Sequence, residues 1–401
     1  MPKVLRIINR FNIGGPTYNA AYLTKYLSSG YETLLVGGVK EEHEKSSEFI
    51  LENLGLEPTI VLEMRRSINP FQDYLAYRKI KKIIKDFKPD IVHTHAAKAG
   101  TLGRLAAINC HVPVIIHTFH GHVFHSYFGT VKTTIFKIIE SYLAHRSTAI
   151  IAISKKQKEE LCDIHTITTR DKCTVIPLGF DLTRFQTDNE SKRLLFRNKY
   201  NIKDDEIAIV IVGRVVSIKN HTLFLDALKF VLDSSNKNVR AFIVGDGDNR
   251  KCIEQQAKER GIEFTTQADS FHNKPLCFTS WIKDVDVVYS GADIVALTSL
   301  NEGTPVSLIE AEAACKPIIT TNIGGIEDIV ENGVTGILVE NNNTEAFGQN
   351  LLNLVEDAGL RERLSIKGRA FVNENYQYNR LVSDVKKLYD TLLENYSKRQ
   401  Q

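Results

Sequence analysis

The dominant feature of the sequence is a regular alternation of short apolar runs with longer amphipathic stretches. The runs are strand-sized and rich in valine and isoleucine, and the stretches between them place apolar residues at helical spacing. Nearly continuous apolar strands separated by helices are typical of parallel sheets covered on both faces. The predicted strands are 4–8, 32–36, 91–93, 114–117, 149–153, 173–176, 207–212, 240–244, 294–297, 318–320 and 336–339.

The alternation begins afresh near residue 207, which predicts an α/β chain of two Rossmann-like domains. We place the first domain at 1–185 and the second at 186–375, with a join that runs from the Pro- and Gly-containing stretch 177–181 to about residue 200. The segment 376–401 is predicted to be helical, and because no strand follows it, a return to the first domain is one way to bury its apolar face. Open parallel sheets bind ligands beyond the carboxyl ends of their strands, so we expect two sheets that face each other across a ligand-binding cleft.

Composition excludes several classes of protein. With 401 residues, 43% hydrophobic and 25% charged, the chain is neither disordered nor fibrous. No apolar run approaches the roughly 18 residues of a spanning helix, and the N-terminus lacks a signal-peptide pattern. Six cysteines are scattered without a C-x-x-C pair, which favours buried thiols in a reducing compartment. We therefore expect a cytoplasmic protein.

Charge is divided unevenly along the chain. The first 180 residues hold 24 Lys/Arg and 16 Asp/Glu, a net charge of +8, whereas the remainder holds 27 and 32, a net charge of −5. A basic domain can approach phosphates or an anionic membrane surface. No motif that interleaves basic and aromatic residues indicates nucleic-acid binding. Contact with the inner face of the cell membrane is therefore one expectation.

Three segments that follow predicted strands could carry chemistry. Gly14 and Gly15 follow the first strand, where they permit either close approach of an anion to a helix N-terminus or merely a tight turn. They do not form the dinucleotide fingerprint G-x-G-x-x-G. Gly213-Arg214 follows the strand 207–212, and Lys219 lies five residues beyond Arg214. These two cations could clamp a diphosphate, or both could simply be solvated.

The most informative segment is 301–310, which follows the strand 294–297 and opens a helix. Glu302 lies in the loop, Gly303 permits an unusual turn, and Glu310 falls one or two turns into the helix. The two carboxylates could accept hydrogen bonds from separate hydroxyl groups of one elongated ligand, while the helix N-terminus meets its phosphates. Alternatively, they are a capping carboxylate and a surface glutamate.

Taken in order, these motifs resemble the retaining nucleotide-sugar glycosyltransferases of family 4, which have the GT-B fold, and in particular bacterial members that build polysaccharides. Further matches are 176–181 before the join, 244–247, and 321–325 followed by Glu327. The resemblance spans about residues 4 to 390.

The resemblance implies a role for each matching residue. Arg214 and Lys219 would hold the donor diphosphate, Glu302 would contact the donor sugar, and Glu310 would bind the ribose hydroxyls. His120 matches the histidine that faces the sugar from the first domain. The remaining donor-binding positions implied are Gly14, Gly15, Gly213, Gly303, Thr304 and Val306.

The resemblance also bears on the acceptor and the mechanism. The segment 95–100 is similar to that of enzymes using lipid carriers, so Lys98 and His122 are candidates for the acceptor side. The family implies retention of the anomeric configuration, attack on the same face that the leaving group departs from, and no cofactor. The expected partners are a UDP-sugar and a lipid-linked or oligosaccharide acceptor.

A metal site formed by histidines is an alternative use of the first domain. Seven of the twelve histidines lie between residues 93 and 125, and imidazole suits zinc. His93 and His95 straddle the end of a predicted strand, so they share one face only while the strand continues, and the family needs no metal. The D-x-D triplets at 246–248 and 284–286 are interpreted as loop carboxylates. We therefore expect no metal.

Two other functions remain open from the sequence. A UDP-GlcNAc 2-epimerase could use the same fold, and a nucleotide-sugar-binding subunit could have lost turnover. Glu302, Glu310 and the paired glycines fit the transferase better than the epimerase, and the intact cations count against a subunit without turnover.

Overall fold

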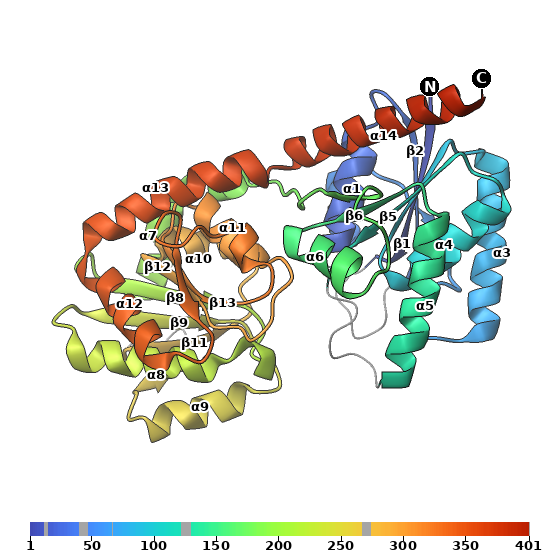
Figure 1. The fold of residues 1–401 in the computed structure, drawn as a ribbon. Coiled ribbons are helices and arrows are strands. Elements are labelled where there is room, and N and C mark those ends of the chain that lie inside the picture. The colour runs from blue at the N-terminus through green and yellow to red at the C-terminus, as the bar shows by residue number, and fades with distance from the viewer. Residues whose placement is uncertain (12–14, 40–46, 66, 122–129, 267–273, 401) are drawn as a thin grey trace. The chain divides into compact units, whose positions relative to one another are not determined.

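The computed structural model describes residues 1–11, 15–39, 47–65, 67–121, 130–266 and 274–400 (Figure 1). These residues form two compact units, the first made of 1–180 with 376–401 and the second of 181–375. The division falls after Phe180, a few residues before the boundary expected from the sequence. The first unit is therefore discontinuous in sequence, whereas the second is one continuous stretch.

The first unit is a seven-stranded parallel sheet in the order β3-β2-β1-β4-β5-β6-β7, with helices on both faces (Figure 1). Its strands are β1 (Lys3–Arg10), β2 (Glu32–Gly38), β3 (Thr59–Ile60), β4 (Ile91–His95), β5 (Val114–Phe119), β6 (Ala149–Ala152) and β7 (Cys173–Val175). Its helices are α1 (Gly15–Tyr26), α2 (Glu48–Asn53), α3 (Pro70–Phe87), α4 (Ala97–Asn109), α5 (Thr130–Arg146), α6 (Lys155–Glu159) and α14 (Tyr378–Gln400).

The second unit repeats this plan with the strand order β10-β11-β9-β8-β12-β13-β14. Its strands are β8 (Ile207–Val212), β9 (Val239–Val244), β10 (Phe264–Thr265), β11 (Leu276–Ser280), β12 (Ile294–Leu297), β13 (Ile318–Asn322) and β14 (Ile337–Glu340). Its helices are α7 (Asn189–Lys199), α8 (His221–Ser234), α9 (Arg250–Glu259), α10 (Val285–Gly291), α11 (Val306–Ala313), α12 (Thr344–Glu356) and α13 (Ala358–Asn375). The predicted fold class, two Rossmann-like domains with parallel sheets, is confirmed.

Each sheet has one point at which the chain reverses its direction of travel across the strands. In the first unit the reversal lies between β1 and β4, and in the second it lies between β8 and β12. The loops that leave the two central strands then turn to opposite faces of the sheet. The crevice they leave is where open α/β sheets bind ligands.

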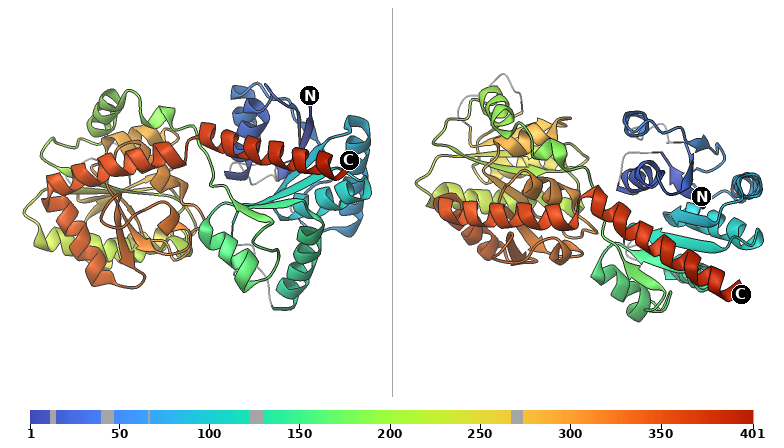
Figure 2. Two further views of the ribbon diagram at one scale, coloured as in Figure 1. Left: turned by 45° about the horizontal axis from the view of Figure 1, so that its top comes forward. Right: turned by 90° about the horizontal axis from the view of Figure 1, so that it is seen from above.

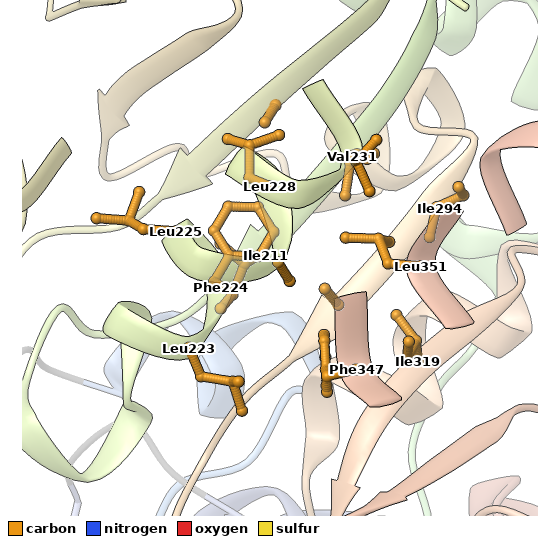
Figure 3. Close-up of a cluster of buried hydrophobic side chains, with 14 of the residues drawn as sticks. Ile211, Leu223, Phe224, Leu225, Leu228, Val231, Ile294, Ile319, Phe347 and Leu351 are labelled. Atoms are coloured by element: carbon orange, nitrogen blue, oxygen red, sulfur yellow. The ribbon is translucent and has the colours of Figure 1, made fainter. Parts of the chain in front are cut away.

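Buried aliphatic and aromatic side chains fix the second sheet beneath its helices. Phe224 and Leu228 of α8 meet Phe347 and Leu351 of α12 over the strands, and all four are fully buried (Figure 3). Interdigitated packing of this kind leaves little freedom for the strands to shift. The loops at their carboxyl ends are therefore held on a rigid base.

The first unit is closed by its last helix. Helix α14 lies across this unit in both views of Figure 2 and packs against α1. Its buried residues Leu381, Val385 and Tyr389 join the core over β1, β4 and β5. The apolar face read from the sequence of this segment is therefore buried in the first unit.

Candidate functional site

In the second unit, Lys219 and Glu302 meet at the point where β8 and β12 diverge. Lys219 ends a short 3-10 turn after β8 (Ser217–Lys219), and its Nζ forms an ion pair with Oε1 of Glu302. The hydroxyl of Ser299, just beyond β12, donates to the same oxygen at 2.6 Å. Within the described chain, Oε2 of Glu302 has no hydrogen bond, so one carboxylate oxygen is held while the other is available.

Hydrogen bonds pin the loop after β12 to the turn after β8. The hydroxyl of Thr298 donates to the carbonyl of Lys219 at 2.9 Å, and the amide of Leu300 donates to the carbonyl of Ile218 at 2.8 Å. From the other side, the Thr321 hydroxyl donates to the carbonyl of Ser299 at 2.7 Å. Lys219 and Glu302 therefore keep their relative positions without a ligand.

Two glycines let the neighbouring loops approach this pair. Gly324, at φ +58°, lies against the carbonyl of Glu302, where an added Cβ would come within 1.9 Å of the oxygen. Gly245, at φ +145°, approaches the carbonyl of Gly213 equally closely. Any larger residue at either position would push a loop away, since both the backbone conformation and the space require glycine.

Among the described residues, no hydrogen bond or ion pair joins Arg214 or Glu310 to the Lys219–Glu302 pair. Arg214 is exposed, and its guanidinium makes no ion pair with any residue in the described part of the chain. Glu310 lies in α11, where Arg184 approaches it at 3.8 Å and the buried Tyr289 side chain lies nearby. Burial raises the pKa of Glu310 to about 7, which the Arg184 charge and the nearby Tyr289 hydroxyl only partly oppose.

Helix α11 begins directly after this loop. Gly303 and Thr304 are half-buried in the loop, Pro305 precedes the helix, and Val306 is its first residue. The N-cap makes no side-chain hydrogen bond to the first turn. The first amides of that turn can therefore donate hydrogen bonds to a ligand.

In the first unit, Gly15 and the histidines lie at the corresponding divergence of β1 and β4. Gly15 begins α1, and a Cβ there would lie 3.6 Å from Leu178, so the position has room. His120, just after β5, shares a hydrogen bond with His95 at the end of β4. Gly14 and His122, also predicted as site residues, lie outside the described residues.

Lys98, the predicted acceptor-side cation, is engaged within the first unit. Its Nζ lies 2.6 Å from Oδ1 of Asp73 in α3 and also donates to the carbonyl of Ser67. The side chain is only 12% exposed. An acceptor phosphate would therefore have to compete with Asp73 for this charge.

The two D-x-D triplets carry carboxylates that are already paired. Asp246 accepts from the Ser280 hydroxyl at 2.8 Å and from Arg250 at 3.0 Å, and these contacts, led by Ser280, lower its pKa. Asp286 pairs with Lys192 at 3.1 Å. Across the described residues, no group of three or more His, Cys, Asp or Glu side chains could hold a metal ion.

Sequence reasoning missed three residues of the site. Ser299 directly follows β12, so the rule that selected Glu302 could also have selected it. Arg184 and Tyr289 reach Glu310 from segments that carry no recognisable motif. Only the packing of α10 beside α11 brings Tyr289 to this carboxyl group.

Two family profiles match the chain along most of its length. Residues 14–184 match "Glycosyltransferase Family 4", and residues 192–371 match "Glycosyl transferases group 1". The chain belongs to the family 4 glycosyltransferases with the GT-B fold.

Similar proteins of known name include two bacterial glycosyltransferases. The chain is 29% identical, over 82% of both chains, to the UDP-Gal:α-D-GlcNAc-diphosphoundecaprenol α-1,3-galactosyltransferase of Escherichia coli. It is 27% identical to the capsular polysaccharide biosynthesis glycosyltransferase CapM of Staphylococcus aureus, over 83% of this chain and 85% of the relative. The fold is similar to that of Anabaena Alr3699/HepE, solved in complex with UDP, with a TM-score of 0.80, 18% identity and coverage of 97% and 100%. This protein is therefore a glycosyltransferase, and its relatives act in glycan and capsule biosynthesis.

The raised pKa of Glu310 predicts a specific pH dependence of stability. Between pH 4.5 and about 7 the folded chain holds a proton that the unfolded chain has released, so the free energy of unfolding falls as pH rises through this window. Glu310→Gln, which imitates the protonated form, should match the wild type near pH 5. Near pH 8 it should be more stable by on the order of 1–3 kcal/mol.

Urea unfolding at the two pH values measures this difference. Glu345→Gln, at an exposed position of α12, controls for the loss of one acidic side chain. A Glu310→Gln offset that is the same at both pH values would contradict the assignment.

Proposed function

We propose that this protein is a retaining, metal-independent glycosyltransferase that moves a sugar from a UDP-sugar to a lipid-linked or oligosaccharide acceptor in cell-surface polysaccharide assembly. The observation that carries the proposal is the ion pair of Lys219 with Glu302, pinned where β8 and β12 diverge. The relative from Escherichia coli, named for a UDP-galactose donor and a diphosphoundecaprenol-linked acceptor, supports this choice of donor and acceptor. The UDP complex of the Anabaena structure agrees with it.

In this proposal the second unit holds the donor by charge and by hydrogen bonds. Lys219 and Arg214 neutralise the diphosphate, whose negative charge grows as the bond to the sugar breaks. Gly213 leaves the backbone open beside Lys219, and the first amides of α11, near Gly303, Thr304 and Val306, donate to the phosphates and the sugar. These contacts stabilise the leaving group more strongly in the transition state than in the bound donor.

The two carboxyl groups would fix the sugar and the ribose. The free Oε2 of Glu302 accepts a hydroxyl of the donor sugar while Lys219 and Ser299 retain Oε1. Glu310, which Arg184 approaches at 3.8 Å, binds the ribose hydroxyls. The family resemblance further assigns Gly14 and Gly15 to the donor phosphates and His120 to the donor sugar.

The bond changes of the proposed transfer balance without a covalent enzyme intermediate. The bond from the anomeric carbon to the phosphate oxygen breaks, and the acceptor oxygen bonds to that carbon on the same face. The acceptor proton passes to the leaving phosphate. In this proposal Lys219 and Ser299 hold Oε1 of Glu302 while a hydroxyl of the donor sugar occupies Oε2, so neither oxygen serves as a nucleophile, which supports this route.

A donor screen combined with Arg214→Ala tests the function. UDP and UDP-sugars should raise the melting temperature more than GDP, ADP or their sugars do. Arg214→Ala should reduce turnover about 10²-fold or more, since one cation on the leaving group is lost. Glu310→Ala should instead raise the donor KM more than it lowers kcat.

Arg363→Ala, an exposed arginine of α13, is the matched control and should leave turnover unchanged. Full turnover by Arg214→Ala would remove the diphosphate role. Formation of an epimerised product from UDP-N-acetylglucosamine alone would favour the epimerase instead.

Metal independence has its own test. One carboxylate of each D-x-D triplet is already paired, Asp246 with Arg250 and Asp286 with Lys192, which supports catalysis by side chains alone. Transfer should therefore continue at the same rate after dialysis against EDTA. A loss of activity that manganese or magnesium restores would refute metal independence while leaving the donor site intact.

We further propose that the first unit contacts an anionic membrane to reach its acceptor. Helix α5 exposes Ile135, Ile138, Ile139 and Tyr142, spaced to form one stripe, and Ile138 is 65% exposed. Residues 91–158 contain eight Lys/Arg and one carboxylate, Glu140. That carboxylate is buried against Arg104 at 2.5 Å, so no described acidic side chain of α5 faces solvent. No described helix is long and apolar enough to cross a membrane.

Sedimentation with vesicles tests the membrane contact. The protein should bind vesicles rich in phosphatidylglycerol at low salt, and binding should weaken as salt rises. Ile138→Ser with Ile139→Ser should weaken it further, whereas Ile366→Ser, a similarly exposed isoleucine of α13, should not. Failure of the wild type to sediment at low salt would remove the membrane proposal and leave the transfer reaction untouched.

A further inference from the structure

A row of side chains on one face of the first sheet leads to His120. His93 uses both ring nitrogens, with Nδ1 2.6 Å from the hydroxyl of Tyr389 in α14 and Nε2 2.7 Å from that of Thr118 in β5. A buried imidazole with both nitrogens engaged cannot rotate without losing two hydrogen bonds. His93 is therefore a fixed point in the first unit.

His95 connects this fixed point to His120. Its ring lies against that of His93, with centroids 4.2 Å apart, and its Nδ1 lies 2.9 Å from Nε2 of His120. Two buried nitrogens remain without a partner among the described residues, Nε2 of His95 and Nδ1 of His120. The side of the His120 ring that faces away from His95 thus carries an unsatisfied polar atom.

Burial keeps the imidazoles of this row neutral, and buried Arg6 lies beside them. Arg6 is fully buried, its Nη1 is 3.4 Å from the Thr24 hydroxyl, and no described carboxylate pairs with it. Burial, together with the Arg6 charge, holds the pKa values of His93 and His95 well below their usual range, and burial lowers that of His120 to about 3. Two neutral imidazoles share one proton, so one ring donates and the other accepts.

The backbone immediately after His95 is strained at Ala96. Ala96 has φ 65° and ψ 160°, a conformation almost confined to glycine. Its carbonyl accepts the amide of Gly100 at 2.7 Å at the start of α4. The strand therefore ends in a strained turn immediately beyond the histidine that contacts His120.

We propose that His95 is a positioning residue, whose Nδ1 holds Nε2 of His120 so that Nδ1 of His120 is the atom presented to the donor sugar. The inference rests on the proposed function, in which His120 contacts that sugar. It goes further by assigning Nδ1 of His120 as the atom that contacts the sugar and His95 as the residue that orients the His120 ring.

Two substitutions of His95 separate the atom from the space it fills. Asparagine carries its amide on Cγ and can reproduce the Nδ1 contact, whereas glutamine carries it one atom further and imitates Nε2. His95→Gln should lower kcat about 10- to 100-fold at nearly unchanged donor KM, because a misplaced group costs mainly transition-state contact. His95→Asn should recover most of that loss.

His117 provides the matched control on the opposite face of the sheet. It is equally buried and bonds the Thr94 hydroxyl through Nδ1 at 2.8 Å. His117→Gln should lower the melting temperature but leave kcat within about threefold of the wild type. Equal kcat losses in His95→Asn and His95→Gln, or full activity of His95→Gln, would overturn the inference.

His120 supplies a second pair that does not disturb the core. His120→Asn keeps an amide at the Nδ1 position and should transfer sugar faster than His120→Gln, and the reverse order would overturn the inference even if the His95 variants fail to fold. His120→Ala separates the proposed sugar contact of His120 from the positioning role of His95. Its full activity would refute the sugar contact itself, whereas its inactivity beside an unaffected His95→Gln would refute only the positioning role.

Discussion

The second unit is organised around an ion pair that is only partly shielded from water. Lys219 and Glu302 retain side-chain exposures of 20% and 13%, so each loses part of its hydration on folding. Such desolvation is offset only when geometry and further hydrogen bonds are good, and here Ser299 and the pinned loops provide them. Their shared arrangement depends on the register of β8 against β12, which the core beneath holds in place. A cation and an acceptor are thus arranged before a ligand arrives.

The two units share one sheet topology but place different kinds of side chain at its reversal point. Both gather polar side chains at the reversal of strand order, as open α/β sheets commonly do. In the second unit these are ionised groups near the surface, suited to a charged ligand. In the first they are neutral imidazoles with a buried arginine behind them, suited to directional hydrogen bonds with uncharged hydroxyls.

The sequence predicted the sheets more fully than it predicted the side-chain contacts. Most strands could be predicted from apolar runs, because a strand that is buried on both faces consists almost entirely of apolar residues. Strand β11 was not predicted, although shorter strands such as β7 were, and α4 was missed because its alanines and glycines leave no polar stripe. Lys219 and Glu302 could be named from their motifs, but their contact depends on strands that pair far apart in sequence. The bond from His93 to Tyr389 could not be predicted, since the sequence suggested that α14 returns to the first unit but not which residues it meets there.

The return of α14 to the first unit has a consequence for how the chain is made. Residues 181–375 form a continuous unit, whereas the first unit needs the last residues of the chain to cover Arg6 and His93. During synthesis from the N-terminus, the second unit can therefore finish folding first. The histidine face of the first sheet stays open to water until α14 has been made, so residues of β1 become enclosed only after the whole second unit has been synthesised.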